Sequence, residues 1–306
     1  MFHNIDPNIK PKGLSDILKW KITAKRSEWS VLPELTSFDI PPTKIASSQE
    51  LRVSYVGHVT FLIQIGGLNI LTDPVWSDRA SPFTFAGPKR IVKPGINFAD
   101  LPKIDFILIS HNHYDHLDIK TIKDLCLRDN PKIITPLMND KIIKKHIDKA
   151  EIITLGWGES YKEFFLESAQ HWSARGLFDK NKALWGTFII RTGIGDICFI
   201  GDSGYNIDIF KEIGEKYNIF LSLIPIGAYS PRWFMKPVHM NPEEAVLTHL
   251  DLRSKFSIAS HFDVFQLADE PYGQAVAELK QAIEKHNIPD DRFIIPKVSD
   301  FFFFAQ

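Results

Sequence analysis

The chain is poor in cysteine. Its 306 residues contain only Cys126 and Cys198, which lie far apart and show no CxxC spacing. Two such cysteines exclude a disulfide framework, and this usage is typical of a reducing compartment. The first twelve residues also lack the basic-then-apolar pattern of a signal peptide. We therefore expect a cytoplasmic protein.

The chain also has no excess of charge of either sign. Lysine plus arginine number 36 against 37 acidic residues, which gives a net charge of -1 with neutral histidine. A dedicated nucleic-acid binder normally carries a clear basic excess, so we expect no nucleic-acid partner. No stretch approaches the roughly 18 uninterrupted apolar residues that a bilayer-spanning helix requires. The composition instead suits an ordinary globular domain.

Residues 1–50 are expected to form an N-terminal helix and a linker that wraps the body. Over residues 13–26, Leu14, Ile17, Leu18 and Ile22 recur at helical spacing among basic side chains. We expect this helix to pack on the body; the alternative is a cationic helix that rests on a membrane surface. Residues 33–50 are rich in proline, serine and threonine, which favours an extended linker.

Residues 51–306 are expected to form one domain. Apolar or alternating runs predict strands, and these are followed by alternating helices and strands and then by further strands. This order predicts an α/β fold with two mixed sheets covered by helices. The four phenylalanines of residues 301–304 predict a buried final strand, with an apolar surface patch as the alternative. Nothing in the pattern decides between a monomer and a homodimer.

Three histidines and an aspartate are concentrated in six residues, where a predicted strand over 104–110 ends and a helix begins. The sequence His-Asn-His-Tyr-Asp-His has the form HxHxDH. Residues two apart in an extended chain point the same way, so His111 and His113 can bind one ion. Asp115 and His116, where the chain turns into the helix, can face a second ion. Imidazole and carboxylate suit zinc, and iron or manganese are alternatives.

Three more residues of ligand type follow later predicted strands. His171 comes after the run at 164–168, Asp202 after the run at 196–200, and His261 after the run at 256–260. Any one of these alone would be an ordinary polar loop residue. Following HxHxDH in this order, they predict a centre for two divalent metal ions.

In these features the chain resembles the metallo-β-lactamase fold superfamily, whose domain is an αββα sandwich. The resemblance implies that one metal is bound by His111, His113 and His171 and the other by Asp115, His116 and His261, with Asp202 bridging them. It also implies that Asp73, in Thr72-Asp73-Pro74, orients a ligand histidine from behind.

A narrower resemblance covers residues 14–275. The following segments look like N-acylphosphatidylethanolamine-hydrolysing phospholipase D: Tyr55–Leu62, Leu71–Arg90, Ile226–Lys236, His239–Val246 and Phe265–Glu270. The resemblance implies a phospholipid substrate, hydrolysed to N-acylethanolamine and phosphatidate by a hydroxide held between the metals. Asp115 and Asp202 would be the catalytic residues, and Tyr114 and His239 would contact the substrate. It also favours peripheral membrane contact through residues 13–26.

Two features leave the substrate open. After His261 the chain reads Phe262-Asp263-Val264, where the resemblance implies Trp-Gly-Thr. The run Arg232–Met235 is either core or the wall of an acyl groove. The alternative function is a metal-dependent hydrolase of a small soluble substrate, either a sugar-phosphate lactone or another phosphodiester, on the same site. A scaffold without activity is disfavoured, because unused ligand residues tolerate substitution.

Overall fold

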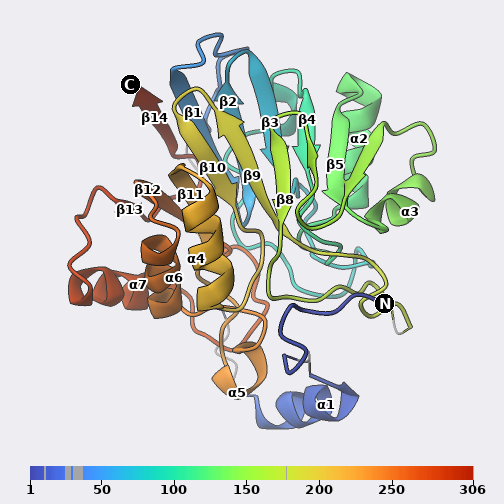
Figure 1. Cartoon of the computed structure of the whole chain (residues 1–306). Coiled ribbons are helices and arrows are strands. Elements are labelled where there is room, and N and C mark those ends of the chain that lie inside the picture. Colours follow the sequence, from blue (N-terminus) through green and yellow to red (C-terminus); the bar gives the residue numbers. More distant parts are fainter. Residues whose placement is uncertain (10–11, 25–28, 30–36, 177, 306) are drawn as a thin grey trace.

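Two seven-stranded mixed sheets pack face to face, with helices on both outer faces (Figure 1). The structure is a computed structural model that describes residues 1–9, 12–24, 29, 37–176 and 178–305. One continuous apolar core lies between the sheets and under the helices of the second sheet. The predicted α/β class, with two mixed sheets flanked by helices, is confirmed.

The first sheet has the strand order β14-β1-β2-β3-β4-β5-β6, and β3 to β6 run parallel to one another. Its strands are β1 (Glu50–Gly57), β2 (Thr60–Ile65), β3 (Leu68–Thr72), β4 (Phe106–Leu108), β5 (Lys132–Pro136), β6 (Ile152–Leu155) and β14 (Phe301–Ala305). Strands β1 to β5 are buried along almost their whole length rather than on alternate residues. This is expected where both faces of a sheet are covered.

The second sheet has the order β13-β12-β11-β10-β9-β8-β7, with β10 to β13 parallel. Its strands are β7 (Ser160–Tyr161), β8 (Phe164–Glu167), β9 (Thr187–Thr192), β10 (Gly195–Phe199), β11 (Ile219–Pro225), β12 (Phe256–Ser260) and β13 (Phe293–Ile294). Parallel strands end at the same edge of their sheet, so the loops that follow β3, β4, β10 and β12 can meet.

The helices divide between the outer faces. Those on the first sheet are α2 (Ile119–Asp129) and α3 (Asn139–Lys144), and those on the second are α4 (Ile207–Lys216), α6 (Pro242–Asp251) and α7 (Gln274–Lys285). The short elements α5 (Arg232–Met235) and η1 (Phe98–Asp100) lie in loops. Among the described residues, we find no helix with the length and apolarity needed to cross a bilayer.

Helix α2 begins where the HxHxDH segment ends, and its start is fixed by a side chain. The carboxylate of Asp118 accepts hydrogen bonds from the main-chain N–H groups of Lys120 and Thr121. Its second oxygen accepts from the N–H of Ser77, so the same residue ties the long 73–97 loop to the helix. An N-cap of this kind typically stabilises a helix by about 1 kcal/mol.

Helix α1 (Leu14–Thr23) lies at one end of the molecule against α5 (Figure 1). The indole of Trp20 stacks on Phe234 with ring centroids 4.9 Å apart, and its N–H donates to Asp269 at 2.8 Å. The predicted helix over 13–26 is therefore present and packs on the body; Lys25 and Arg26 lie outside the described residues. The Arg232–Met235 run is a short helix in which only Met235 is buried, so of the two alternatives for this run the structure disfavours the core segment.

The predicted final strand is present, but the expectation that it is buried is wrong. Strand β14 pairs with β1 but forms the edge of the sheet, and its burial alternates. Phe302 and Phe304 pack against the core, whereas Phe301 and Phe303 are 49% and 59% exposed. The reason is that an edge strand of a sandwich faces the core on one side only.

Candidate metal centre

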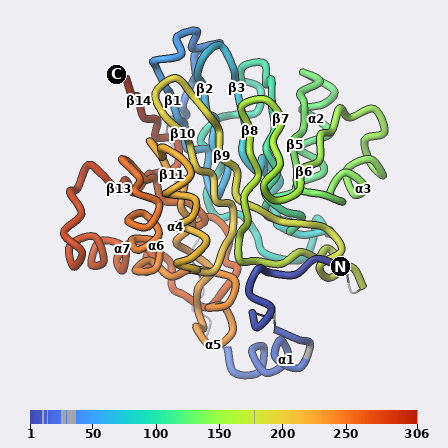
Figure 2. Tube along the Cα trace, viewed as in Figure 1, coloured from blue at the N-terminus to red at the C-terminus, as the bar shows by residue number. Residues whose placement is uncertain are grey.

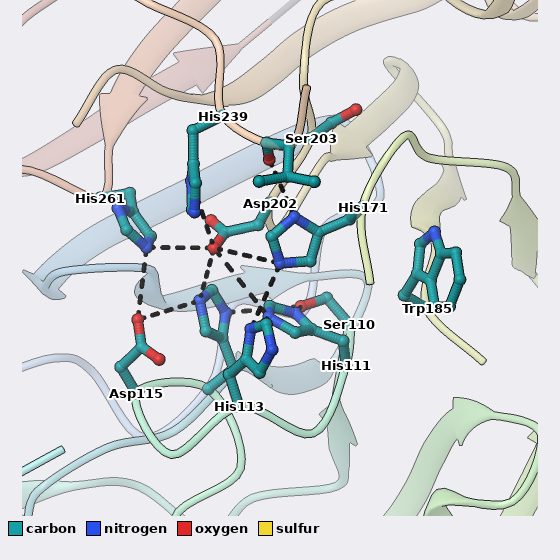
Figure 3. A network of polar contacts seen from close by, with 12 residues as sticks. Ser110, His111, His113, Asp115, His171, Trp185, Asp202, Ser203, His239 and His261 are labelled. Carbon is teal, nitrogen blue, oxygen red and sulfur yellow. Dashed lines mark hydrogen bonds and ion pairs between the residues drawn. The ribbon is translucent and has the colours of Figure 1, made fainter. Parts of the chain in front are cut away.

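The predicted ligand residues come together at the edge where the parallel strands end (Figure 3). His111, His113, Asp115 and His116 follow β4, and His171, Asp202 and His261 follow β8, β10 and β12. Most of these side chains are buried. Three residues at this edge, His58, Asp73 and His261, have positive φ angles of 60°, 31° and 60°. Such conformations are uncommon outside glycine and cluster at functional sites.

Three imidazoles form the first group of converging ligand atoms. His111 Nε2 lies 2.8 Å and His171 Nε2 3.3 Å from His113 Nδ1. The other ring nitrogen of His111 contacts the Ser110 hydroxyl at 3.0 Å, and that of His171 contacts the carbonyl of Val238 at 2.8 Å. A carbonyl can only accept, so His171 carries its proton on Nδ1 and its Nε2 lone pair is bare.

A second group surrounds Asp115. Its Oδ2 lies 2.9 Å from Nε2 of His58 and 3.3 Å from Nε2 of both His116 and His261. The ligand atoms of these four buried residues lie within 4.8 Å of one another. His58 sits in the tight turn between β1 and β2 and was not predicted as a ligand candidate. A single histidine after a strand, without a neighbouring ligand residue, carries no distinguishing signal in the sequence.

Asp202 stands between the two groups (Figure 3). Its Oδ2 lies 3.2 Å from Nε2 of both His116 and His261, and 4.0 and 3.8 Å from Nε2 of His111 and His171. Its other oxygen is buried without a hydrogen-bond partner among the described residues. One carboxylate therefore faces ligand atoms of both groups, which is the position a bridging ligand requires.

The charges in this pocket are strongly coupled. Burial opposes ionisation of Asp115 and Asp202, but the neighbouring imidazoles outweigh it and hold the pKa of both carboxyls well below the usual range. Burial also opposes protonation of His261, yet Asp202 and Asp115 raise its pKa to about 9. Burial and repulsion from His116 keep the pKa of His111 well below its ordinary value. Carboxylate and neutral imidazole are the forms that coordinate metals.

These residues fit divalent cations. Nε2 of His111 and Nε2 of His171 both face Nδ1 of His113. This nitrogen carries at most one proton, so it can donate to only one of the two lone pairs. The negative charges of Asp115 and Asp202 favour a proton on the neighbouring imidazole of His261, and a metal cation could take the place of that proton. Cations at these positions would satisfy both groups of atoms. The first group could hold one ion and the second another, with donor sets of imidazole and carboxylate that suit zinc, iron or manganese.

Asp73 lies behind the ligands, on the side away from the converging atoms. Its Oδ2 is 2.6 Å from His116 Nδ1, so it directs the Nε2 of this histidine toward Asp115 and Asp202. The same carboxylate accepts hydrogen bonds from the main-chain N–H and the hydroxyl of Ser110. Hydrogen bonds of this kind fix the tautomer and ring orientation of metal-binding histidines.

The two residues predicted to contact substrate lie in different places. His239 Nδ1 is 3.8 Å from Asp202 Oδ2, beside the metal ligands. Tyr114 turns away from them: its hydroxyl donates to the carbonyl of Arg175 at 2.8 Å, under the guanidinium of the same residue. Tyr114 lines a cavity of about 670 Å³ between the 76–84 loop and the start of α2. The roles of both residues stay predictions.

Proteins with related sequences agree on one family. The profile described as "Beta-lactamase superfamily domain" matches residues 68–262. An N-acyl-phosphatidylethanolamine-hydrolyzing phospholipase D from Caenorhabditis elegans is 39% identical over 265 residues, covering 81% of this chain and 74% of its own length. The mitochondrial enzyme of the same name from Saccharomyces cerevisiae is 33% identical over 288 residues, covering 89% of this chain and 60% of its own length.

Solved structures show the same fold at low identity. The metallo hydrolase Igni18 from Ignicoccus hospitalis aligns with a TM-score of 0.62 at 20% identity, over 84% of this chain and 99% of its own. An isothiocyanate hydrolase from Delia radicum gut bacteria aligns with a TM-score of 0.67 at 18% identity, over 83% and 100%. The fold, the clustered ligand residues and the sequence relatives lead to one conclusion. The chain belongs to the beta-lactamase superfamily, in the branch that contains N-acylphosphatidylethanolamine-hydrolysing phospholipases D, and is a metal-dependent hydrolase.

Proposed function

We propose that the chain hydrolyses N-acylphosphatidylethanolamine-type phospholipids to N-acylethanolamine and phosphatidate, with two divalent metal ions, zinc by preference. The observation that carries this proposal is the 39% identity to the Caenorhabditis elegans enzyme over most of both chains. The convergence of the ligand residues supports the requirement for metal. The identity extends well beyond the HxHxDH segment, which favours a shared substrate class over a shared fold alone.

The metals would be held by two sets of side chains. His111, His113 and His171 would hold one ion, Asp115, His116 and His261 the other, and Asp202 would bridge them. His58 joins the second set as a ligand or as the hydrogen-bond partner that fixes Asp115. When bound, such ions act as Lewis acids and lower the pKa of water toward 7.

The chain's own side chains supply orientation and proton transfer. His58 Nε2 lies 2.9 Å from Oδ2 of Asp115 and fixes this carboxylate. The other oxygen of Asp115, Oδ1, can take the proton of the attacking water and pass it to the oxygen of the departing N-acylethanolamine. His239 lies beside Asp202, with 13% of its side chain exposed, and can donate a hydrogen bond to a substrate phosphate. Tyr114 borders the neighbouring cavity, where the rest of the substrate can lie.

An enzyme with a lipid substrate must also contact the lipid surface, and α1 has side chains suited to this contact. Leu18 and Ile22 on this helix are 60% and 75% exposed, and Trp233 on the adjoining α5 is 40% exposed. Lys19 lies 5.0 Å from the Trp233 ring centroid, so a basic side chain borders these apolar ones. Apolar side chains flanked by lysine are typical of helices that rest on anionic membranes. We propose that this face provides peripheral membrane contact.

The test is a substrate panel. The full chain, loaded with zinc, is given vesicles of N-acylated phosphatidylethanolamine, vesicles of plain phosphatidylethanolamine, and soluble bis-p-nitrophenyl phosphate. We expect N-acylethanolamine and phosphatidate from the first, little reaction with the second, and loss of turnover with a chelator. Turnover confined to the soluble diester would reject the lipid substrate and favour the small-substrate alternative.

A further inference from the structure

Asn4 is buried against the metal centre although it stands 167 residues from its partner in the sequence. Its side chain is one of the buried polar groups of the described chain, at 8% exposure. Asn4 Oδ1 accepts from the main-chain N–H of His171 at 3.0 Å, and Asn4 Nδ2 donates to the carbonyl of His171 at 3.0 Å. One amide side chain thus pairs with both polar groups of one residue's backbone, as a neighbouring strand would.

His171 depends on these bonds because nothing else in the described chain takes their place. The residue is fully buried in the 168–186 loop, whose described residues form neither helix nor strand. No main-chain hydrogen bond fixes its N–H or its carbonyl among the described residues. Its imidazole Nδ1 donates to Val238, which leaves Nε2 facing His113 and Asp202. Asn4 and Val238 together account for every polar atom of His171 except the one that points at the ligand atoms.

The segment that carries Asn4 is itself anchored to the same loop. The N–H of Phe2 donates to the carbonyl of Asn181 at 2.8 Å, and the Phe2 side chain packs against the core. Asn4 Nδ2 also approaches the carbonyl of Ile9 at 3.4 Å, which closes the segment on itself. Figure 2 shows residues 1–9 running beside the loop between β8 and β9. This segment lies outside the 68–262 match, so the family profile does not include it.

We propose that Asn4 is a positioning residue for His171: it fixes the backbone of this metal ligand and thereby sets the affinity of the ion that His111, His113 and His171 hold. The inference rests on the proposed metal centre. The Asn4 side chain makes no hydrogen bond to Asp115, His116 or His261, so an ion held by these three residues should keep its affinity. Loss of a hydrogen-bond partner that holds a metal ligand in place typically changes metal affinity by about 10- to 100-fold.

The test is a Co²⁺ titration of the metal-free full chain in competition with a chelating dye. Binding is monitored through the absorption bands of the protein-bound Co²⁺. We compare Asn4→Ala, Asn4→Asp and the control Asn8→Ala, an exposed asparagine in the same segment. Asn4→Ala is expected to weaken one of the two binding steps about tenfold and to leave the other unchanged. Asn4→Asp keeps the acceptor for the His171 N–H but sets a carboxylate oxygen against the His171 carbonyl, so a loss at least as large as that of Asn4→Ala is expected in the same step. Asn8→Ala is expected to bind as the wild type does.

A double-mutant cycle separates positioning from a general loss of stability. In a His171→Ala background, Asn4→Ala is expected to cause no further loss of affinity, because the ligand through which it acts is gone. Equal losses in both backgrounds, or wild-type binding by Asn4→Ala, would overturn the proposal. A wild-type chain that binds no Co²⁺ would instead contradict the metal centre itself and the proposed function with it. Thermal unfolding of the metal-free variants shows whether each one folds.

Discussion

Asp73 accepts two hydrogen bonds from Ser110, one from its main-chain N–H at 2.7 Å and one from its hydroxyl at 2.5 Å. The hydroxyl has a single proton, and that proton goes to Asp73. Its oxygen, 3.0 Å from His111 Nδ1, must therefore accept from this histidine. Asp73 thus orients His116 directly and His111 through Ser110, and these two histidines belong to different ligand groups.

This relay predicts that Ser110→Ala weakens metal binding. The substitution removes the acceptor for the His111 Nδ1–H and leaves Asp73 and His116 in place. We expect about a tenfold loss of affinity in one of two metal-binding steps, measured by competition with a chelator. Asp73→Asn is expected to weaken both steps. A buried serine remote from the ligands, Ser222, provides the control as Ser222→Ala. Unchanged metal affinity in Ser110→Ala would show that the hydroxyl has no part in orienting His111.

Gly201 is predicted to be intolerant of even one methyl group. A Cβ there would lie 2.4 Å from Ser110 Cβ, and the residue has φ of +66°. Gly201→Ala should therefore lower the free energy of unfolding by more than about 2 kcal/mol, since it adds overpacking to backbone strain. Gly66→Ala, with φ of +56° and nothing within 4 Å of the added Cβ, measures the strain alone. Urea denaturation of both variants gives the comparison, and equal losses would contradict the close approach.

His113→Ala is predicted to abolish turnover without unfolding the chain. The side chain meets both His111 and His171, so its loss breaks the first ligand group. We expect hydrolysis of bis-p-nitrophenyl phosphate to fall by at least about 100-fold, with the circular dichroism spectrum unchanged. His286→Ala, at a histidine near α7 that contacts Glu243, is the control. Retained activity in His113→Ala would place the chemistry elsewhere.

Metal removal is predicted to lower the stability of the fold. Ions that bind only the folded chain stabilise it by about 2.7 kcal/mol when their free concentration is 100 times Kd. The thermal unfolding midpoint should therefore rise with added Zn²⁺ and fall with a chelator. His113→Ala should show a smaller rise, because one ligand group is incomplete. A midpoint that does not respond to either reagent would speak against metal binding by the folded chain.

What the sequence could predict depended on how local each signal was. The HxHxDH segment concentrates its ligands in six residues, and Asp202 and His261 directly follow apolar runs that form strands. His58 was missed because one histidine after a strand has no local signal, and only the fold brings it to Asp115. Asn4 is a stronger case, because its partner His171 is 167 residues away and only the fold brings the Asn4 amide to the His171 main chain.

Secondary structure was likewise predictable where the signal in the sequence is local. Strands β2 and β3 coincide with two apolar runs of the sequence, which are separated by Gly66 and Gly67, and both glycines have the positive φ that the turn requires. The exposure of Phe301 and Phe303 could not be predicted, since four phenylalanines in a row do not reveal that their strand lies at an edge. Whether a strand lies at the edge of a sheet depends on which strands lie next to it in the fold, and the composition of the strand does not show this.

Two metal ions are proposed to lie among these histidines and aspartates. Anomalous diffraction from crystals of the zinc-loaded chain, collected on both sides of the zinc absorption edge, tests this proposal directly. We predict two zinc peaks, one among His111, His113 and His171 and one among Asp115, His116 and His261, with Asp202 between them. A single peak would reject the dinuclear centre. The absence of any peak at these side chains, in crystals that contain zinc, would contradict the account as a whole.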